Sequence, residues 1–253
     1  MRLSRFVSRL NIVPVAIVSQ VDFSQQRRHK QLLHQYWKRS SFLAISTLAL
    51  ITSVKSMAAD EPVVISAQQI GSGNPVIGKE KSDSGRCQEC HGVDGNSNDE
   101  RIPNHAGQHE GYLIKQLSNF QSGERYHVVM TIMAEDLSAT DKADIAAYFA
   151  SQKIMHGEGG NDNTPAKNLF VNGDQARDIP ACISCHGDNG KGKIADRVIY
   201  PVIGGQQRVY LRSQLINWKL GDRKNSTDGV MNKIAKSLTD DEIDALANYI
   251  CGL

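Results

Sequence analysis

Two short stretches of this chain hold the residue types that could bind a metal-containing cofactor. The pattern Cys-x-x-Cys-His occurs twice, and its second copy begins 95 residues after the first. Two thiols three positions apart can add to the two vinyl groups of one porphyrin, while the adjacent imidazole reaches the iron. The spacing predicts two covalently attached haem c groups. The predicted attachment and ligand residues are Cys87, Cys90 and His91, and Cys182, Cys185 and His186.

An isolated Cys-x-x-Cys pair has other interpretations. It can form half of a zinc site, a thioredoxin-like redox pair or a structural disulfide. In this chain both copies carry the histidine, both continue as His-Gly, and both place a second glycine three positions later, at Gly95 and Gly190. The longer shared pattern favours haem attachment over these alternatives.

The two motifs belong to a longer internal repeat. Between Pro103 and Arg125, matching residues recur at a constant offset of 98, and matches from Met130 onward recur at an offset of 101. The chain is therefore predicted to contain the same domain twice, with small insertions in loops. The expected division is a leader over 1–58, a first domain over 59–155, a Gly- and Asn-rich linker over 156–166 and a second domain over 167–253.

The repeat also indicates the second axial ligand of each iron. Thioether sulfur is the usual partner of histidine in electron-transfer cytochromes. Of the six methionines, only Met130 and Met231 occupy matched positions, each seven residues before a leucine near the start of the last helix. They are the predicted sulfur ligands, and the alternative is that they are core methionines.

The elements that must position these residues are predicted to be helices. Ser138 and Thr239, each followed three residues later by an acid, are capping boxes that begin the final helix of each half. A second helix in each half is indicated by apolar residues at i, i+4 and i+7, and a shorter one should end near Arg86 and near Ala181. No stretch shows sustained β alternation. The apolar residues of the second helices are Leu113, Leu117 and Phe120, matched by Leu211, Leu215 and Trp218.

The remaining cysteine and several histidines are not repeated. Cys251 follows an apolar helical face formed by Ile243, Leu246, Ala247 and Ile250, which predicts a free, partly buried thiol. An intermolecular disulfide is the minor alternative. His105, His109, His127 and His156 have no counterpart in the second half and are expected to be surface or structural residues.

The first 58 residues differ in composition from the rest. They contain nine Lys or Arg and one acidic residue, and an apolar run over 42–54 is followed by small residues at Ser56 and Ala58. This layout predicts an export signal that is cleaved near Ala58/Ala59. The apolar run is shorter than the roughly 20 residues of a membrane-spanning helix, although a retained anchor stays open as an alternative.

Removing this leader reverses the sign of the charge. The whole chain carries a net charge of +2, whereas 20 basic and 26 acidic residues remain after residue 58. This gives no support for nucleic-acid binding and favours redox partners that present cationic patches. Haem attachment belongs outside the reducing cytosol, so the predicted location is the periplasm.

The motifs together resemble those of a known family. The first half reads Cys-Gln-Glu-Cys-His-Gly-Val-Asp-Gly-Asn from Cys87 and Tyr-Leu-Ile-Lys-Gln-Leu from Tyr112, and the second reads Pro-Ala-Cys-Ile-Ser-Cys-His-Gly from Pro180. From about residue 70 to the C-terminus the chain resembles the dihaem cytochrome c4 family, which has two tandem class I cytochrome c domains. The resemblance implies an all-α fold in which each domain wraps around one covalent haem, and it independently implies Met130 and Met231 as sulfur ligands.

The resemblance also bears on two further pairs of residues. In related cytochromes a proline at the place of Pro103 and Pro201 offers its carbonyl to the ligand histidine, although a simple turn proline is the alternative. Arg125 and Arg223 could pair with haem propionates, or pack in the core or lie at the surface.

An iron closed on both faces favours outer-sphere transfer of single electrons. We therefore expect an electron carrier and not an enzyme, which by resemblance serves a respiratory chain between a redox donor and a terminal oxidase. The alternatives are an electron-accepting subunit of a catalytic complex, such as flavocytochrome c sulfide dehydrogenase, or a dihaem enzyme such as thiosulfate dehydrogenase. Peripheral association with the membrane stays open.

Overall fold

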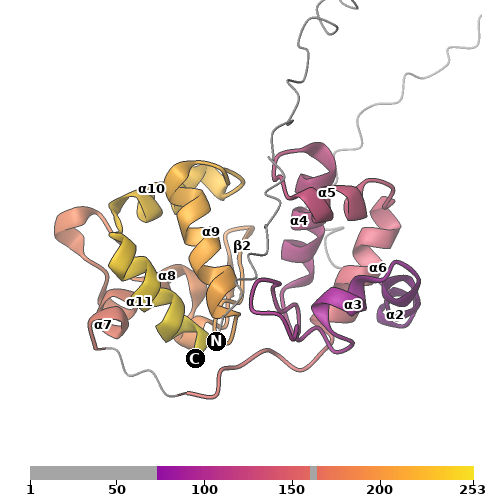
Figure 1. Cartoon of the computed structure of the whole chain (residues 1–253), viewed down its shortest axis with the longest axis horizontal. Helices are drawn as coiled ribbons and strands as arrows, with labels where there is room; N and C mark the ends of the chain where they lie inside the picture. Colours follow the sequence, from indigo (N-terminus) through magenta and orange to yellow (C-terminus); the bar gives the residue numbers. More distant parts are fainter. Residues whose placement is uncertain (1–72, 160–163) are drawn as a thin grey trace, which may run out of the picture. The chain divides into compact units, whose positions relative to one another are not determined.

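The computed structural model describes residues 73–159 and 164–253 (Figure 1). The expected leader, its cleavage site and the first residues of the expected first domain lie outside the described residues. None of the helices in the described ranges has the length and apolar character needed to cross a membrane. The N-terminal half contains α2 (Pro75–Ser84), α3 (Cys87–His91), α4 (Glu110–Ser122), α5 (Val128–Ala134) and α6 (Ala139–Ala150).

The C-terminal half repeats this order of helices, which confirms the predicted all-α class. Its helices are α7 (Thr164–Asn172), α8 (Cys182–His186), α9 (Arg208–Leu220), α10 (Val230–Ser237) and α11 (Asp240–Cys251). Matched helices have the same length in three cases, with 5 residues in α3 and α8, 13 in α4 and α9, and 12 in α6 and α11. This half also contains three short 3-10 turns, at Gln175–Arg177, Asp188–Gly190 and Thr227–Gly229.

The C-terminal half also contains a small hairpin that the sequence did not predict. Strand β1 (Lys193–Ala195) pairs antiparallel with β2 (Val198–Tyr200). Strands of three residues are too short to show an alternating pattern. The turn between them places Asp196 and Arg197 in the left-handed region, at φ 49° and 65°, where a glycine would have been the usual signal.

The two predicted capping boxes are confirmed. At the start of α6, the hydroxyl of Ser138 accepts a hydrogen bond from the backbone N–H of Asp141 at 3.1 Å, and the Asp141 carboxylate accepts one from the backbone N–H of Ser138 at 3.0 Å. Thr239 and Glu242 form the same pair at the start of α11. Each box satisfies two N–H groups that have no partner inside the helix.

The helices that lead into the cysteine motifs end differently from each other. Helix α2 ends at Ser84, close to the predicted end near Arg86, whereas α7 ends at Asn172 and not near Ala181. Gly173, with φ 70°, ends α7 in the left-handed region, and its ideal Cβ would lie 2.3 Å from the carbonyl oxygen of Ile179. The close approach of a turn at this position therefore stops the helix nine residues early.

Each half has its own apolar cluster. The predicted apolar face of α11 is buried against α7 and α9, and Ile243 is fully buried. In the N-terminal half α6 packs against α2 and α4 in the same way. The cluster of the C-terminal half contains Ala166, Leu169, Phe170, Ile179, Leu211, Leu215, Leu238, Ile243, Leu246, Ala247 and Ile250, and that of the N-terminal half contains Leu113, Ile145, Ala146, Tyr148 and Phe149.

The chain that joins the halves is packed where it is described. Met155 is 4 % exposed and lies in a small cluster with Ala106 and Val202. The backbone N–H groups of Gly157 and Gly159 then donate to the carbonyl oxygens of Leu253 and Gly252, at 2.5 and 3.1 Å. Residues 154–159 are thus fixed to both halves and to the C-terminus of the chain.

Two glutamines at matched positions tie the halves together. Gln108 accepts a hydrogen bond from the backbone N–H of Val202 at 2.9 Å and donates to its carbonyl oxygen at 2.8 Å. Gln206 makes the equivalent pair with Asn104, at 2.7 and 2.9 Å. All four residues are buried. Val202 follows Pro201, and Asn104 follows Pro103. Each glutamine therefore binds the loop of the other half that contains the matched proline.

Replacing Gln108 by alanine should destabilise the protein by about 1–3 kcal/mol. The change leaves the N–H and the carbonyl of Val202 buried without a partner. Chemical denaturation followed by circular dichroism measures the difference. Gln175→Ala is a matched control, because Gln175 is exposed and should change stability by less than about 0.5 kcal/mol. Equal stability of the two variants would contradict the role of the glutamine.

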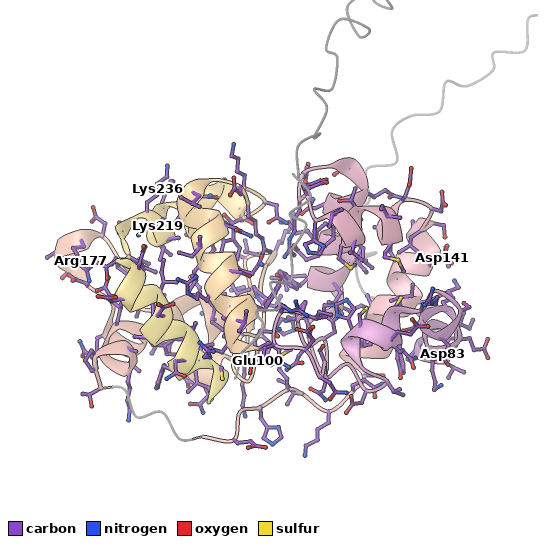
Figure 2. All side chains as sticks on the ribbon, in the orientation of Figure 1. Asp83, Glu100, Asp141, Arg177, Lys219 and Lys236 are labelled. Carbon is purple, nitrogen blue, oxygen red and sulfur yellow. The ribbon has the colours of Figure 1, made fainter. Side chains whose placement is uncertain are left out.

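Glu242 contributes stability that depends on pH. Its carboxylate forms a two-pronged ion pair with Arg177, at 2.6 and 3.0 Å, on the surface of the C-terminal half, where Figure 2 labels Arg177. The guanidinium lowers the pKa of Glu242 to about 2. A carboxyl group whose pKa is lower in the folded state stabilises the fold above its unfolded pKa and loses this effect as the pH falls toward the folded value.

Glu242→Gln should therefore be less stable than the wild type at pH 7, and the difference should shrink as the pH falls from about 4.5 toward 2. Glutamine keeps the capping geometry, so the variant isolates the charge. The loss should stay below about 1 kcal/mol, because the pair is partly exposed. Denaturation curves at pH 7, 4 and 3 measure it. A difference that is constant across this range would show that the charge of Glu242 is irrelevant.

Candidate cofactor sites

Each cysteine motif forms a single short helix, α3 or α8. In such a helix the positions i, i+3 and i+4 share one face. Cys87, Cys90 and His91 therefore point to the same side, as do the matching residues of α8. None of the five cysteines, all of which lie within the described residues, takes part in a disulfide. Burial raises the pKa of Cys87, and it raises that of Cys182 to about 11, so both sulfurs lie in apolar surroundings that suit contact with a porphyrin.

Both histidines of the motifs are oriented by a proline carbonyl. The Nδ1 atom of His91 lies 3.0 Å from the carbonyl oxygen of Pro103, and that of His186 lies 3.0 Å from the carbonyl oxygen of Pro201. A carbonyl oxygen can only accept, so Nδ1 carries the proton and Nε2 keeps its lone pair for a metal. Burial lowers the pKa of both imidazoles, which favours the neutral form that binds iron. The geometry thus fits the carbonyl interpretation of the prolines rather than that of simple turn residues.

The two matched methionines lie on the matched helices α5 and α10. Met231 packs against the apolar cluster of the C-terminal half together with Cys182, so the structure brings these two sulfurs to one cluster. Met130 is half-buried on α5, which packs against α4, and Cys87 packs against the cluster of the same half. Met133, one turn away, is 40 % exposed.

Arg125 and Arg223 form a buried network across the two halves. Arg125 donates to Gln116 of its own half at 2.7 Å and to Tyr210 and Gln214 of the other half at 3.0 and 2.9 Å. Arg223 mirrors this pattern, with Gln214 at 2.8 Å in its own half and Tyr112 and Gln116 across the interface at 3.2 and 3.1 Å.

The charges of these arginines lack a counter-charge from the residues that the structure describes. Within residues 73–159 and 164–253, no Asp or Glu forms an ion pair with either guanidinium, although both residues are at least nine-tenths buried. The guanidinium of Arg125 stacks on Phe120 at 4.7 Å, and that of Arg223 stacks on Trp218 at 4.0 Å. A buried guanidinium remains charged and favours a nearby anion. The carboxylates of two haems would supply such anions, so the residues present fit this cofactor.

His105, which the sequence analysis expected to be a surface or structural residue, lies beside the first site. The ring of His105 stacks on that of His91 at 4.1 Å between centroids and touches Phe149 at 5.5 Å. Burial holds the pKa of His105 well below its usual value, so its ring is neutral. The prediction of a structural role is in keeping with this position. In the sequence, the only sign that the two sites differ at this position is that the second half has no histidine to match His105.

Comparison with known proteins identifies relatives that match most of the described residues. The family model for cytochrome c matches residues 156–253. Cytochrome c4 of Pseudomonas aeruginosa is 42 % identical over 170 residues, which cover 66 % of this chain and 83 % of that protein. The crystal structure of reduced recombinant cytochrome c4 from Pseudomonas stutzeri matches with a TM-score of 0.67 at 37 % identity, covering 72 % of this chain and all of that one.

The chain belongs to the cytochrome c4 family. Members of the family are dihaem c-type cytochromes that carry electrons and are not enzymes, which confirms the predicted cofactor and class of activity. A further relative is named for its role as an electron acceptor. The "thiosulfate dehydrogenase electron acceptor" of Stutzerimonas stutzeri is 31 % identical over 210 residues, which cover 81 % of this chain and 91 % of that protein.

Proposed function

We propose that this member of the cytochrome c4 family is a periplasmic carrier that passes single electrons along a respiratory chain toward a terminal oxidase. One haem is attached to Cys87 and Cys90, and the other to Cys182 and Cys185. The proposed axial ligands are His91 and Met130 for the first iron, and His186 and Met231 for the second. The domains are those expected from the repeat, 59–155 and 167–253, after cleavage near Ala58/Ala59.

The observation that carries the ligand assignment is the orientation of the two imidazoles. In both halves the proline carbonyl fixes the tautomer that leaves Nε2 free, at the same distance of 3.0 Å. Haem supplies a one-electron couple at the iron. The protein holds each ring in place and neutralises the carboxylates through Arg125 and Arg223.

The experiment that tests this function is a redox titration of the exported holoprotein with optical and electron paramagnetic resonance spectra. We expect two haems per chain, both low-spin and six-coordinate in either oxidation state, and no ready binding of carbon monoxide by the reduced protein. A high-spin or five-coordinate iron in the resting protein would favour an enzyme. Oxidation of the reduced protein by membranes that contain a terminal oxidase tests the proposed acceptor.

A second candidate function is to accept electrons from a thiosulfate-oxidising enzyme. It is favoured by the similarity to the thiosulfate dehydrogenase electron acceptor, which covers more of this chain than the match to cytochrome c4 of Pseudomonas aeruginosa. Reduction of the purified protein by thiosulfate alone would be slow, whereas a catalytic amount of a thiosulfate dehydrogenase would make it fast. Equal rates with and without this enzyme would remove the candidate.

A further inference from the structure

Trp218 presents a buried hydrogen-bond donor that no group in the described part of the chain satisfies. Its indole Nε1 atom has no hydrogen-bond partner within the described ranges, and it is inaccessible to solvent. Leaving a buried N–H without an acceptor costs about 1–3 kcal/mol. A buried donor of this kind therefore indicates that an acceptor is present in the complete protein.

The two halves differ at this position. Trp218 lies on α9 at the place that Phe120 occupies on α4. Both rings support the stacked guanidinium of the matched arginine, Arg223 or Arg125. Phenylalanine provides the stacking surface alone, whereas tryptophan adds an N–H group. The extra donor is thus a property of the C-terminal half only.

The ring of Trp218 lies on the side of α9 that faces the apolar cluster of the C-terminal half. It packs against the apolar cluster that also contacts Cys182 and Met231. The side chain of Asn232, next to Met231, donates to the carbonyl oxygens of Trp218 and Arg223 at 2.9 and 2.7 Å. The backbone of the tryptophan is therefore tied to the helix that carries the proposed sulfur ligand.

The positive charge of Arg223, which stacks on Trp218, favours a negatively charged acceptor for the indole N–H. Arg223 is 4 % exposed and has no acidic partner from the described part of the chain. A carboxylate beside this guanidinium would accept from the indole N–H as well, and charge-assisted hydrogen bonds are the stronger ones. Haem brings two such groups into an apolar site.

We propose, on the basis of the haem assignment above, that the indole N–H of Trp218 donates a hydrogen bond to a carboxylate of the second haem, and that this bond raises the reduction potential of that haem. The negative charge of a carboxylate near the iron favours the ferric state. A donor that offsets this charge favours the ferrous state. Because Phe120 offers no donor, the first haem lacks this contribution, and Trp218 makes the two centres unequal.

The test compares the wild-type holoprotein with Trp218→Phe in a potentiometric titration at constant pH. Phenylalanine keeps the stacking on Arg223, as Phe120 does in the first half. The reduction equilibrium of the second haem should shift toward the ferric state by about threefold, which is about 30 mV at 59 mV per tenfold for one electron. The potential of the first haem should move much less.

The matched variant is Phe120→Trp, which offers the missing donor to the first haem. It should raise the potential of that haem and leave the second unchanged. A shift of both potentials by the same amount in either variant would contradict the proposal, and so would unchanged potentials in Trp218→Phe. Optical spectra that show two low-spin haems in each variant separate this result from a failure of the haem assignment itself.

A measurement on the wild-type holoprotein does not depend on whether a variant acquires its haems. Trp218 is the only tryptophan after the predicted cleavage site, because the other of the two is Trp37. In ¹⁵N-labelled holoprotein the single indole N–H signal should exchange with solvent at least about tenfold more slowly than in the unfolded chain. Its position should change between the oxidised and reduced states. A rapidly exchanging signal, or one that ignores the oxidation state, would overturn the proposal.

Discussion

Replacing Met231 by histidine should lower the reduction potential of the second haem by on the order of 0.2 V. Thioether sulfur favours the ferrous state, whereas a second imidazole favours the ferric state. Axial ligands span about 0.8 V among haem proteins, so a change of this size is a modest part of that range. The potentiometric titration described above would show one of the two potentials shifted, and it would identify which belongs to the second haem.

The control for this change is Met133→Leu. Met133 lies on the same helix as Met130 but is exposed and matches Ile234 in the second half. Both potentials should then stay within about 20 mV of the wild type, because no iron ligand is altered. If Met231→His left both potentials unchanged, a different residue would be the ligand of the second iron.

Replacing both Cys182 and Cys185 by alanine should yield a protein with one attached haem in place of two. Helices α7 to α11 should also lose most of their order. A domain of this size buries little apolar surface by itself, and its cluster borders Cys182 and Met231 where the porphyrin would pack. The mass of the purified protein reports the haem count, and limited proteolysis should digest the chain after about residue 160.

Cys251→Ala provides the control for loss of a thiol. Cys251 is half-buried at the end of α11 and belongs to no Cys-x-x-Cys-His motif, so this variant should keep two haems and resist proteolysis. Two haems in the Cys182 and Cys185 double variant would contradict the attachment sites proposed for the second half.

Local sequence patterns predicted most of the helices that position the cofactor-binding residues. The capping boxes at Ser138 and Thr239 set the start of the last helix in each half, because such boxes act between neighbours in the sequence. The tautomer of His91 depends on Pro103, twelve residues away, and the matched proline indicated this contact as one of two alternatives. The repeat located the methionines, and their role as ligands stays a prediction.

Contacts between distant residues could not be predicted in this way. The end of α7 depends on the approach of Ile179 to Gly173, and the hairpin at Lys193–Tyr200 depends on a turn without glycine. The partners of Arg125 lie in the other half of the chain, so no periodicity within one half reports them. The sequence pattern identified Trp218 and Phe120 only as matched apolar positions. Such a pattern gives no information on whether the indole N–H of a tryptophan has a hydrogen-bond acceptor.

The reciprocal bonds of Gln108 and Gln206 are those of a two-fold symmetric dimer enclosed in one polypeptide. In such a dimer the same residue of each subunit grips the same loop of its partner. A polypeptide that ends after residue 155 would carry both Asn104 and Gln108, the complete set of groups for this exchange. When loaded with its own haem, it should pair with a second copy of itself, as expected if the chain arose by fusion of two identical ancestral subunits.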